Sequence, residues 1–169
     1  SSMYLKAGET LSLQDTLYGL MLASGNDAAV AIAGECGGMT AFVGKMNAKA
    51  AELGLTDTHF DNPNGLPSDT HYTTAHELAK ITAAALKDPV FRQIVSTKSC
   101  TVSGHVLSNH NRLLSMYDGA IGVKTGFTRA AGRCLVSAAE RNGRTIIAVT
   151  LNDPNDWNDH REMLDAGFA

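Results

Sequence analysis

The stretch at residues 119–128 brings together side chains that could do chemistry. Lys124, Thr125 and Gly126 supply an ammonium, a hydroxyl and a position without a side chain. A glycine within a strand often marks a place where a ligand or another backbone comes close. A cation, a hydroxyl and an open strand edge suit an extended substrate that ends in a carboxylate and adds itself to the sheet. The structural alternative is that these residues form a common strand end without a function.

A second group of polar residues, Ser24-Gly25-Asn26, separates two predicted helices. The first helix is predicted over 13–23. The second is predicted over 27–35, a segment rich in alanine that we expect to be buried nearly all round. Polar groups in such a place need hydrogen-bond partners. One interpretation is pure capping, in which Asn26 satisfies the helix start and Ser24 a turn; the other is that both side chains belong to a functional site.

Two further features define the helical half of the chain. Ser12, with Asp15 three residues later, is a typical start for helix 13–23. A third helix is predicted over 41–53, capped by Thr40 and stopped by Gly54. The residues expected to face inward are Leu13, Leu17, Leu20 and Met21 in the first helix and Phe42, Met46, Ala50 and Leu53 in the third.

The middle of the chain holds a long irregular segment, 56–73, which is dense in turn-forming residues. A loop of this length in a domain is usually functional or ordered by its own side chains. Asn62 and Asn64 are expected to build its turn. Two helices follow, over 75–87 after a Thr74–Glu77 capping box, and over 89–95 with proline at its first position.

The last part of the chain is predicted to be mostly β-structure. A strand pair is expected within 99–106. A turn at Asp118-Gly119 is expected to open a strand that ends in Lys124-Thr125-Gly126, and strands over 132–139 and 144–151 follow. Asn142-Gly143 between the last two is a strong hairpin signal. A final helix is predicted over 160–166, capped by Asp159. Helices, an antiparallel three-stranded meander and a last helix indicate an α+β fold in which helices pack on a sheet.

Composition excludes several classes of protein. The chain has 169 residues, of which 44% are hydrophobic and 18% charged, and this is typical of one globular domain with a proper core. The net charge is -3, and no basic stripe points to nucleic acid as a partner. No apolar run is long enough to span a membrane. The first residues are neither a start nor a targeting segment.

The cysteines and histidines indicate no metal site. Three cysteines, Cys36, Cys100 and Cys134, lack zinc-type spacing, and we expect them to be small buried apolar side chains. The histidines at 71, 76, 105 and 110 are scattered among loops and caps without metal-ligand spacing, and we expect surface or capping roles. No cofactor is implied.

The two polar groups resemble two of the three motifs of the penicilloyl serine transferases, in which Ser-x-x-Lys is the third. The closer resemblance is to low-molecular-mass D-alanyl-D-alanine carboxypeptidases, which are penicillin-binding proteins with a β-lactamase/transpeptidase-like fold. It runs over nearly the whole chain. The matching segments are residues 22–29, 64–66, 72–75, 124–128, 131–132 and 165–168, which include Ser24-Gly25-Asn26, Asn64-Gly65-Leu66 and Lys124-Thr125-Gly126.

This sequence departs from the family pattern in one respect, because no serine is followed three positions later by lysine. In the family the Ser-x-x-Lys helix lies upstream of the segment that resembles the first residues of this chain. The resemblance therefore implies that residues 1–169 are a single but incomplete catalytic domain, without the nucleophile and the first strands of the sheet. Three strands without those neighbours leave an open edge, at which pairing with another chain is expected.

The resemblance implies acyl transfer by a serine-type D-Ala-D-Ala carboxypeptidase acting on peptidoglycan stem peptides, with β-lactams as inhibitors. Ser24 would relay a proton, and Asn26 would bind a substrate amide. Lys124 would place positive charge beside the substrate carboxylate and form a hydrogen bond to Ser24. Thr125 would bind the substrate carboxylate with its hydroxyl, and Gly126 would leave room for the ligand backbone. The backbone N–H of Phe127 would donate to the oxyanion, and Arg161 would be a further carboxylate ligand. The expected location is extracytoplasmic, in the bacterial cell envelope.

Two other hypotheses remain open. One is a catalytically silent chain, or a homologue that binds peptidoglycan peptides without cleaving them. The other is a serine β-lactamase on the same fold, which is weakened because the loop 56–73 contains no glutamate that could activate a deacylating water.

Overall fold

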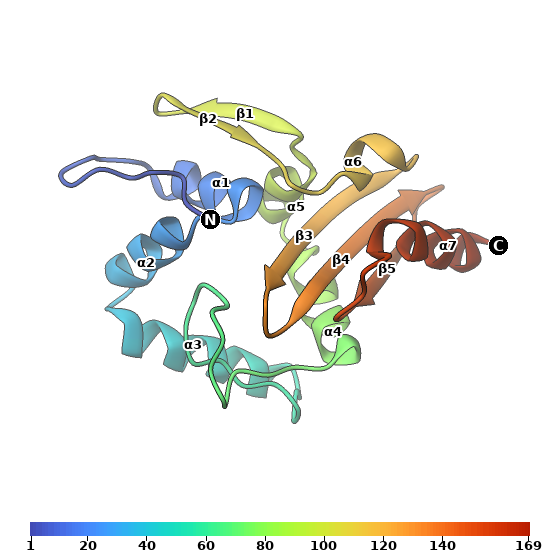
Figure 1. Cartoon of the computed structure of the whole chain (residues 1–169), viewed down its shortest axis with the longest axis horizontal. Coiled ribbons are helices and arrows are strands. Elements are labelled where there is room, and N and C mark those ends of the chain that lie inside the picture. Colours follow the sequence, from blue (N-terminus) through green and yellow to red (C-terminus); the bar gives the residue numbers. More distant parts are fainter.

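Helices make up the first part of the chain and a three-stranded sheet the second, in a computed structural model that describes residues 1–169 (Figure 1). None of the helices is long and apolar enough to cross a bilayer. The elements are α1 (Leu13–Ala23), α2 (Asn26–Glu35), α3 (Met39–Glu52), α4 (Ala75–Ala85), α5 (Pro89–Ser96), β1 (Ser99–Val102), β2 (His105–Ser108), α6 (Leu113–Met116), β3 (Ala120–Thr128), β4 (Gly132–Arg141), β5 (Arg144–Thr150) and α7 (Asp156–Phe168).

The main sheet is antiparallel in the order β3-β4-β5, and β1 and β2 form a separate hairpin. The turn between β4 and β5 has positive φ at both Asn142 and Gly143, as a type I′ hairpin requires. Helix α7 packs on β4 and β5, and α4 and α5 also contact the sheet. The predicted α+β layout is thus confirmed. Strand β5 lies at one edge of this sheet, and its pairing with another chain stays a prediction.

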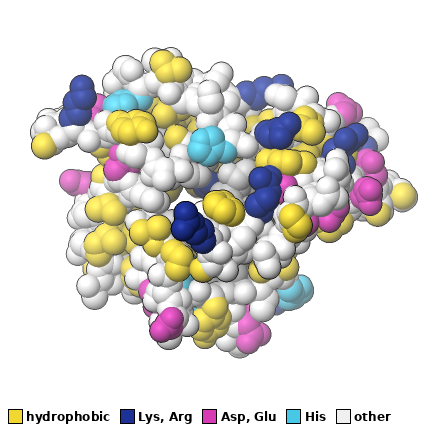
Figure 2. All heavy atoms as spheres, viewed as in Figure 1, with side chains coloured by type: hydrophobic (Ala, Val, Ile, Leu, Met, Phe, Trp, Pro, Cys, Tyr) yellow, Lys and Arg dark blue, Asp and Glu magenta, His cyan; other side chains and the backbone are white.

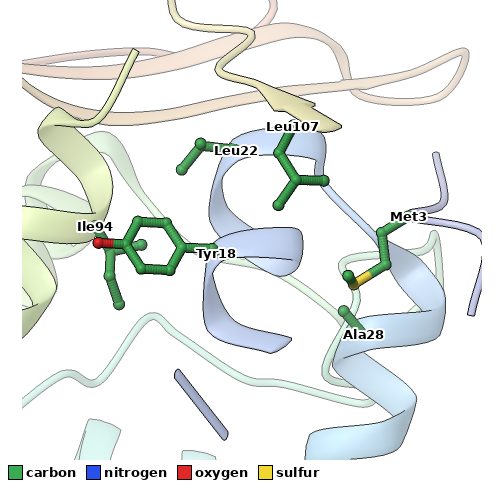
Figure 3. Packing of buried hydrophobic residues seen from close by; sticks show 6 residues of the cluster. All are labelled: Met3, Tyr18, Leu22, Ala28, Ile94 and Leu107. Atoms are coloured by element: carbon green, nitrogen blue, oxygen red, sulfur yellow. The ribbon is translucent and has the colours of Figure 1, made fainter. Parts of the chain in front are cut away.

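One apolar cluster holds the helical half together and is shown in Figure 3. It joins α1, α2, α5 and β2 with the N-terminal segment. Leu22 is completely buried, and burial of such a side chain contributes about 1.5–3 kcal/mol. Gly19 lacks a side chain because a Cβ there would lie 2.1 Å from the sulfur of Met3. The members of the cluster are Met3, Tyr18, Leu22, Ala28, Ile94 and Leu107.

Helix α5 connects this cluster to the sheet through two neighbouring residues. Ile94 belongs to the helical cluster, whereas Val95 packs with Val123 of β3 in a second cluster. Gly122 of β3 allows this approach, because a Cβ there would lie 2.9 Å from a methyl group of Val95. The position of β3 relative to α1 is therefore fixed through α5.

The predicted inward faces of two helices need correction. The buried side of α1 is centred on Tyr18 and Leu22, and Leu13 is exposed. Helix α2 is buried on only one side, through Ala28, Ala29, Ile32 and Ala33, whereas Val30 is exposed. A run of alanines has no periodic contrast, so the sequence did not reveal that one side of α2 remains open to solvent.

Three predicted caps are wrong, although the helices exist. Gly25 is the N-cap residue of α2, so Asn26 is the first helical residue. The N-cap residue of α3 is Gly38 and not Thr40, because the helix begins directly after the Gly37-Gly38 pair. The last helix begins at Asp156 after Asn155, well before Asp159, because Asp156 is buried in contact with the sheet. The caps Ser12 and Thr74 are confirmed, as is proline at the first position of α5.

Asp27 at the start of α2 holds the N-terminal segment in place. Its carboxylate accepts hydrogen bonds from the Ser2 hydroxyl at 2.6 Å and from the N–H groups of Met3, Leu5 and Ala28, each at 3.0 Å. Burial by itself would raise the pKa of this carboxyl, but the four hydrogen bonds outweigh it and lower the pKa of Asp27 to about 2.

We predict that Asp27→Asn destabilises the protein by about 1–3 kcal/mol at neutral pH, because three N–H groups and a hydroxyl lose their charged acceptor. The pKa of Asp27 in the folded protein lies below the value of about 4 that an aspartate has in an unfolded chain. The contribution of its carboxylate to the free energy of unfolding is therefore fully present above pH 4. It should disappear as the pH falls towards 2. Urea denaturation of both proteins across this pH range measures the difference.

Asp69→Asn is the matched control, because Asp69 is an exposed aspartate. Two results would contradict the role given to Asp27. One is equal destabilisation by the two substitutions. The other is a difference in free energy of unfolding between wild type and Asp27→Asn that does not become smaller on acidification.

Candidate active site

A cleft of about 740 Å³ lies where the helical half meets the sheet. Its walls are the end of α1 and the start of α2, the loop residues 62–66, and β3 from Lys124 to Thr128. The first residues of β4 and of α7 also line it. On the face shown in Figure 2, basic and apolar side chains gather near the centre, over the ends of β3 and β4, and acidic side chains lie mostly towards the rim.

The two polar groups singled out in the sequence meet across this cleft. The Lys124 ammonium donates a hydrogen bond to the Ser24 hydroxyl, although the two residues are 100 positions apart in the sequence. It also donates to the carbonyl oxygen of Thr125 at 2.7 Å. The predicted contact between the lysine and the serine is therefore present.

Ser24 ends α1 in an uncommon backbone conformation. Its φ and ψ of 54° and 38° lie in the left-handed region, and its N–H bonds to Gly19. A residue other than glycine in this region costs about 1–2 kcal/mol. Such strain recurs at functional sites, where the surrounding structure holds the residue in place. Here it accompanies a serine whose hydroxyl contacts the ammonium.

Burial alters the acidity of the lysine. Because the protein removes water from Lys124 and offers it no carboxylate partner, desolvation lowers the pKa of its ammonium to about 8. A lysine with this pKa can carry a positive charge at neutral pH and can also give up or take a proton at little cost.

The other predicted site residues of α2 and β3 also line the cleft. Asn26 lies at the N-terminus of α2 and is not its cap. Thr125, Gly126 and Phe127 follow Lys124 along β3, and Phe127 is 71% exposed. A Cβ at Gly126 would meet nothing closer than Cys134 at 3.7 Å, so the fold itself tolerates a side chain there. The absence of a side chain at Gly126 leaves space next to the strand.

The loop beside the cleft is ordered by a buried glutamate. Glu77 in α4 accepts hydrogen bonds from the N–H groups of Thr56 and Asp57 and from the Thr58 hydroxyl, the last at 2.5 Å. Asn62 bonds through its side chain to the backbone of Leu66, as predicted for a turn-building residue. The loop is thus ordered by Glu77 of α4 as well as by its own side chains.

Arg161 does not lie where the sequence analysis expected a ligand. It is exposed on α7 and absent from the cleft lining. Because α7 starts at Asp156 rather than after Asp159, Arg161 falls in the second turn of the helix. The arginine that lines the cleft is Arg133 of β4, which lies beside Trp157 and is paired with Asp156.

Sequence reasoning missed several other lining residues. His71 and His110, expected at surfaces or caps, both line the cleft, and burial lowers the pKa of each. Cys134 also lines it, and all three cysteines are only half-buried. No spacing in the sequence distinguishes these residues from ordinary loop and strand positions. No group of three or more histidine, cysteine or acidic side chains is arranged to hold a metal.

We predict that the Lys124 ammonium titrates near pH 8, because burial makes its charged form costly. Side-chain NMR of labelled lysine, with the signal assigned by its loss in Lys124→Arg, measures this. An apparent pKa close to the value of about 10.4 for an exposed lysine would show that the ammonium is not desolvated.

Comparison with known proteins shows the family to which the chain is related. The family model of D-alanyl-D-alanine carboxypeptidases matches residues 1–155. A D-alanyl-D-alanine carboxypeptidase of a Streptomyces strain is 40% identical over 100% of this chain and 65% of that protein. One of Mycobacterium tuberculosis is 40% identical over 98% of this chain and 61% of that protein. The chain thus spans about two thirds or less of the length of these relatives.

Solved structures show the same fold. A Streptomyces DD-transpeptidase superposes with a TM-score of 0.94 at 39% identity, covering 99% of this chain and 72% of that chain. The D-alanyl-D-alanine carboxypeptidase of Mycobacterium tuberculosis superposes with the same TM-score of 0.94 at 38% identity, covering 99% of this chain and 68% of that chain. On sequence and fold together, the chain belongs to the D-alanyl-D-alanine carboxypeptidase family of serine peptidases.

Proposed function

We propose that these residues form one wall of the active site of a serine-type D-Ala-D-Ala carboxypeptidase that cleaves peptidoglycan stem peptides through an acyl-enzyme. The observation that carries the proposal is the hydrogen bond from Lys124 to Ser24 across the cleft. The family relationship and the names of the relatives support the substrate class. The proposed location is outside the cytoplasm, at the bacterial cell wall.

The acylated serine belongs to a part of the protein outside these 169 residues, which contain no Ser-x-x-Lys. It would attack the carbonyl of the terminal peptide bond, expel D-alanine and form an ester that water then hydrolyses. The Phe127 N–H would help to stabilise the oxyanion of the tetrahedral intermediate.

The residues on this side of the cleft have distinct tasks. The Ser24 hydroxyl, oriented by Lys124, passes a proton to the leaving amine of the departing D-alanine. Asn26 holds a substrate amide. Strand β3 lies at a sheet edge, so an extended peptide can pair with its backbone next to Gly126, and Thr125 donates its hydroxyl to the peptide carboxylate.

The alternative of a β-lactamase gains no support from the loop beside the cleft. The loop 56–73 contains no glutamate. Glu77, the glutamate that contacts this loop from α4, is 5% exposed and directs its carboxylate oxygens to the loop backbone and Thr58. It is therefore not free to activate a deacylating water.

We predict that the full-length protein forms a covalent adduct with benzylpenicillin, whereas residues 1–169 alone do not. Intact-mass measurement after incubation distinguishes the two. A stoichiometric adduct on residues 1–169 would place the nucleophile inside this chain and overturn the assignment. Absence of an adduct on the full-length protein would favour the catalytically silent homologue.

Lys124→Ala in the full-length protein should slow acylation by about 10²- to 10³-fold or more, because a preorganised charge and the anchor of Ser24 are both lost. Stopped-flow or mass-based acylation rates measure this. Lys87→Ala, which removes an exposed lysine after α4, serves as the matched control. Unchanged acylation in Lys124→Ala would remove this lysine from the site.

A further inference from the structure

The loop wall of the cleft is a narrow hairpin that projects from beside α3, with its tip between α2 and the end of β3 (Figure 1). Residues 62–66 form the tip. The side chain of Asn62 closes it, because it accepts from the N–H of Leu66 and donates to the carbonyl oxygen of the same residue. At the base, the backbones of His59 and Tyr72 pair in an antiparallel bridge. The place of the tip in the cleft wall therefore depends on the residues between the tip and the base.

His71 joins the two sides of the hairpin directly below the tip. The N–H of Asp61 donates a hydrogen bond to Nδ1 of His71 at 3.0 Å, and the Thr70 hydroxyl donates to the Asp61 carboxylate at 2.7 Å. The His71 ring also lies edge-on to Phe60, with 5.8 Å between the ring centres. Phe60 in turn exchanges two backbone hydrogen bonds with the side chain of Asn47 in α3. The imidazole thus connects the start of the tip to a segment that is fixed to α3.

The hydrogen bond from Asp61 can form in only one protonation state of His71. An imidazole nitrogen that accepts a hydrogen bond carries no proton, so the proton is on Nε2 and the ring is neutral. Protonation of Nδ1 would place two N–H donors against each other. His71 is half-buried, and this burial is the main reason why the pKa of its imidazole is lowered. The charge of Asp61 raises the pKa of His71, and a charge on His59 lowers it.

Other charged or titratable side chains face His71 from the remaining walls of the cleft. They are His110, Lys124 and Arg133, together with Asp156 at the start of α7. Asp61 and His59, which act on the pKa of His71, both belong to the hairpin itself. The protonation of His71 is therefore governed by the segment whose position it controls.

We propose that neutral His71 is a positioning residue that holds the tip 62–66 in the cleft wall, and that its protonation releases the tip and weakens substrate binding in mild acid. With the bond from Asp61 formed, the imidazole binds a proton less readily than in the released loop, where its pKa has the ordinary value of about 6.5. The tip is therefore fully held above that pH, and the held fraction decreases as the pH falls below it. The proposal rests on the carboxypeptidase function proposed above, because it concerns the same cleft.

His71→Asn in the full-length protein is the main test, because asparagine keeps an acceptor near the place of Nδ1 but does not titrate. The quantity compared is kcat/KM for a peptide ending in D-Ala-D-Ala, as the ratio of wild type to His71→Asn, in which the titration of all other groups cancels. The ratio should be close to one at about pH 8 and fall about two- to tenfold at about pH 5, mainly through KM, as expected for loss of one hydrogen bond. A ratio that is the same at both pH values overturns the proposal.

Two more variants separate the hydrogen bond from other roles of the ring. His71→Ala removes the acceptor, so its kcat/KM should be about two- to tenfold below that of His71→Asn at every pH. Equal losses in His71→Ala and His71→Asn at about pH 8 would show that only packing against Phe60 matters, which contradicts the proposal. His110→Asn tests the other histidine of the cleft, whose pKa burial also lowers. Disappearance of the acid loss in His110→Asn rather than in His71→Asn also overturns the proposal.

NMR of the full-length protein tests the role of His71 without catalysis. With labelled histidine, and the signal assigned by its loss in His71→Asn or His71→Gln, the proton should be on Nε2 and not on Nδ1 at about pH 8. Hydrogen exchange of the Asp61 N–H, compared between wild type and variant at the same pH, should be faster in wild type only in acid. A proton on Nδ1 at about pH 8, or equal exchange in acid, overturns the proposal.

The two proposals fail in different ways. If wild type cleaves no peptide ending in D-Ala-D-Ala at any pH, the proposed function fails. The position of the imidazole proton and the exchange of the Asp61 N–H then decide the role of His71, because neither measurement depends on turnover.

Discussion

The candidate site depends on one hydrogen bond, from the ammonium of Lys124 to the hydroxyl of Ser24. It joins the helical half of the chain to the sheet, and each half contributes only one of the two groups. The bond requires β3 to be held at a fixed distance from the end of α1. Helix α5 provides that spacing, because Ile94 packs into the helical cluster and Val95 into the cluster beside β3.

Burial gives the lysine its chemistry and limits what it can do. Removal of water lowers the pKa of Lys124 to about 8, and the hydrogen bonds to Ser24 and to the Thr125 carbonyl occupy two of the three N–H donors of its ammonium. A second cation at the cleft, Arg133, is fixed by a buried carboxylate and keeps part of its guanidinium exposed. The cleft thus has one buried cation with a lowered pKa and a second, partly exposed cation that is paired with a carboxylate.

Carboxylates hold the segments around the cleft in place. Asp27 binds the N-terminal segment to α2, Glu77 binds the long loop to α4, and Asp156 binds β4 to the start of α7. Each accepts several hydrogen bonds, and Glu77 and Asp156 are buried. Buried or half-buried carboxylates are stable here because N–H and O–H donors replace the water that they lose.

The sequence predicted the elements and much of the site because those features are local. Periodicity and caps located the helices, Asn142-Gly143 located the hairpin, and the two polar groups pointed to Ser24 and Lys124. The exposed side of α2, the first residue of α7 and the true N-cap residues of α2, α3 and α7 could not be predicted in this way. Each depends on what packs against the segment.

The sequence by itself therefore determined which residue types can do the chemistry, since both the Ser-x-Asn turn and the Lys-Thr-Gly strand can be recognised in it. Only the tertiary structure decided that Arg133 lines the cleft and Arg161 does not. Their chemical types are identical, and neither neighbouring sequence marks a ligand. The difference comes from the register of β4 against β3 and from the turn of α7 on which Asp156 lies, and both are set by packing of the sheet against that helix.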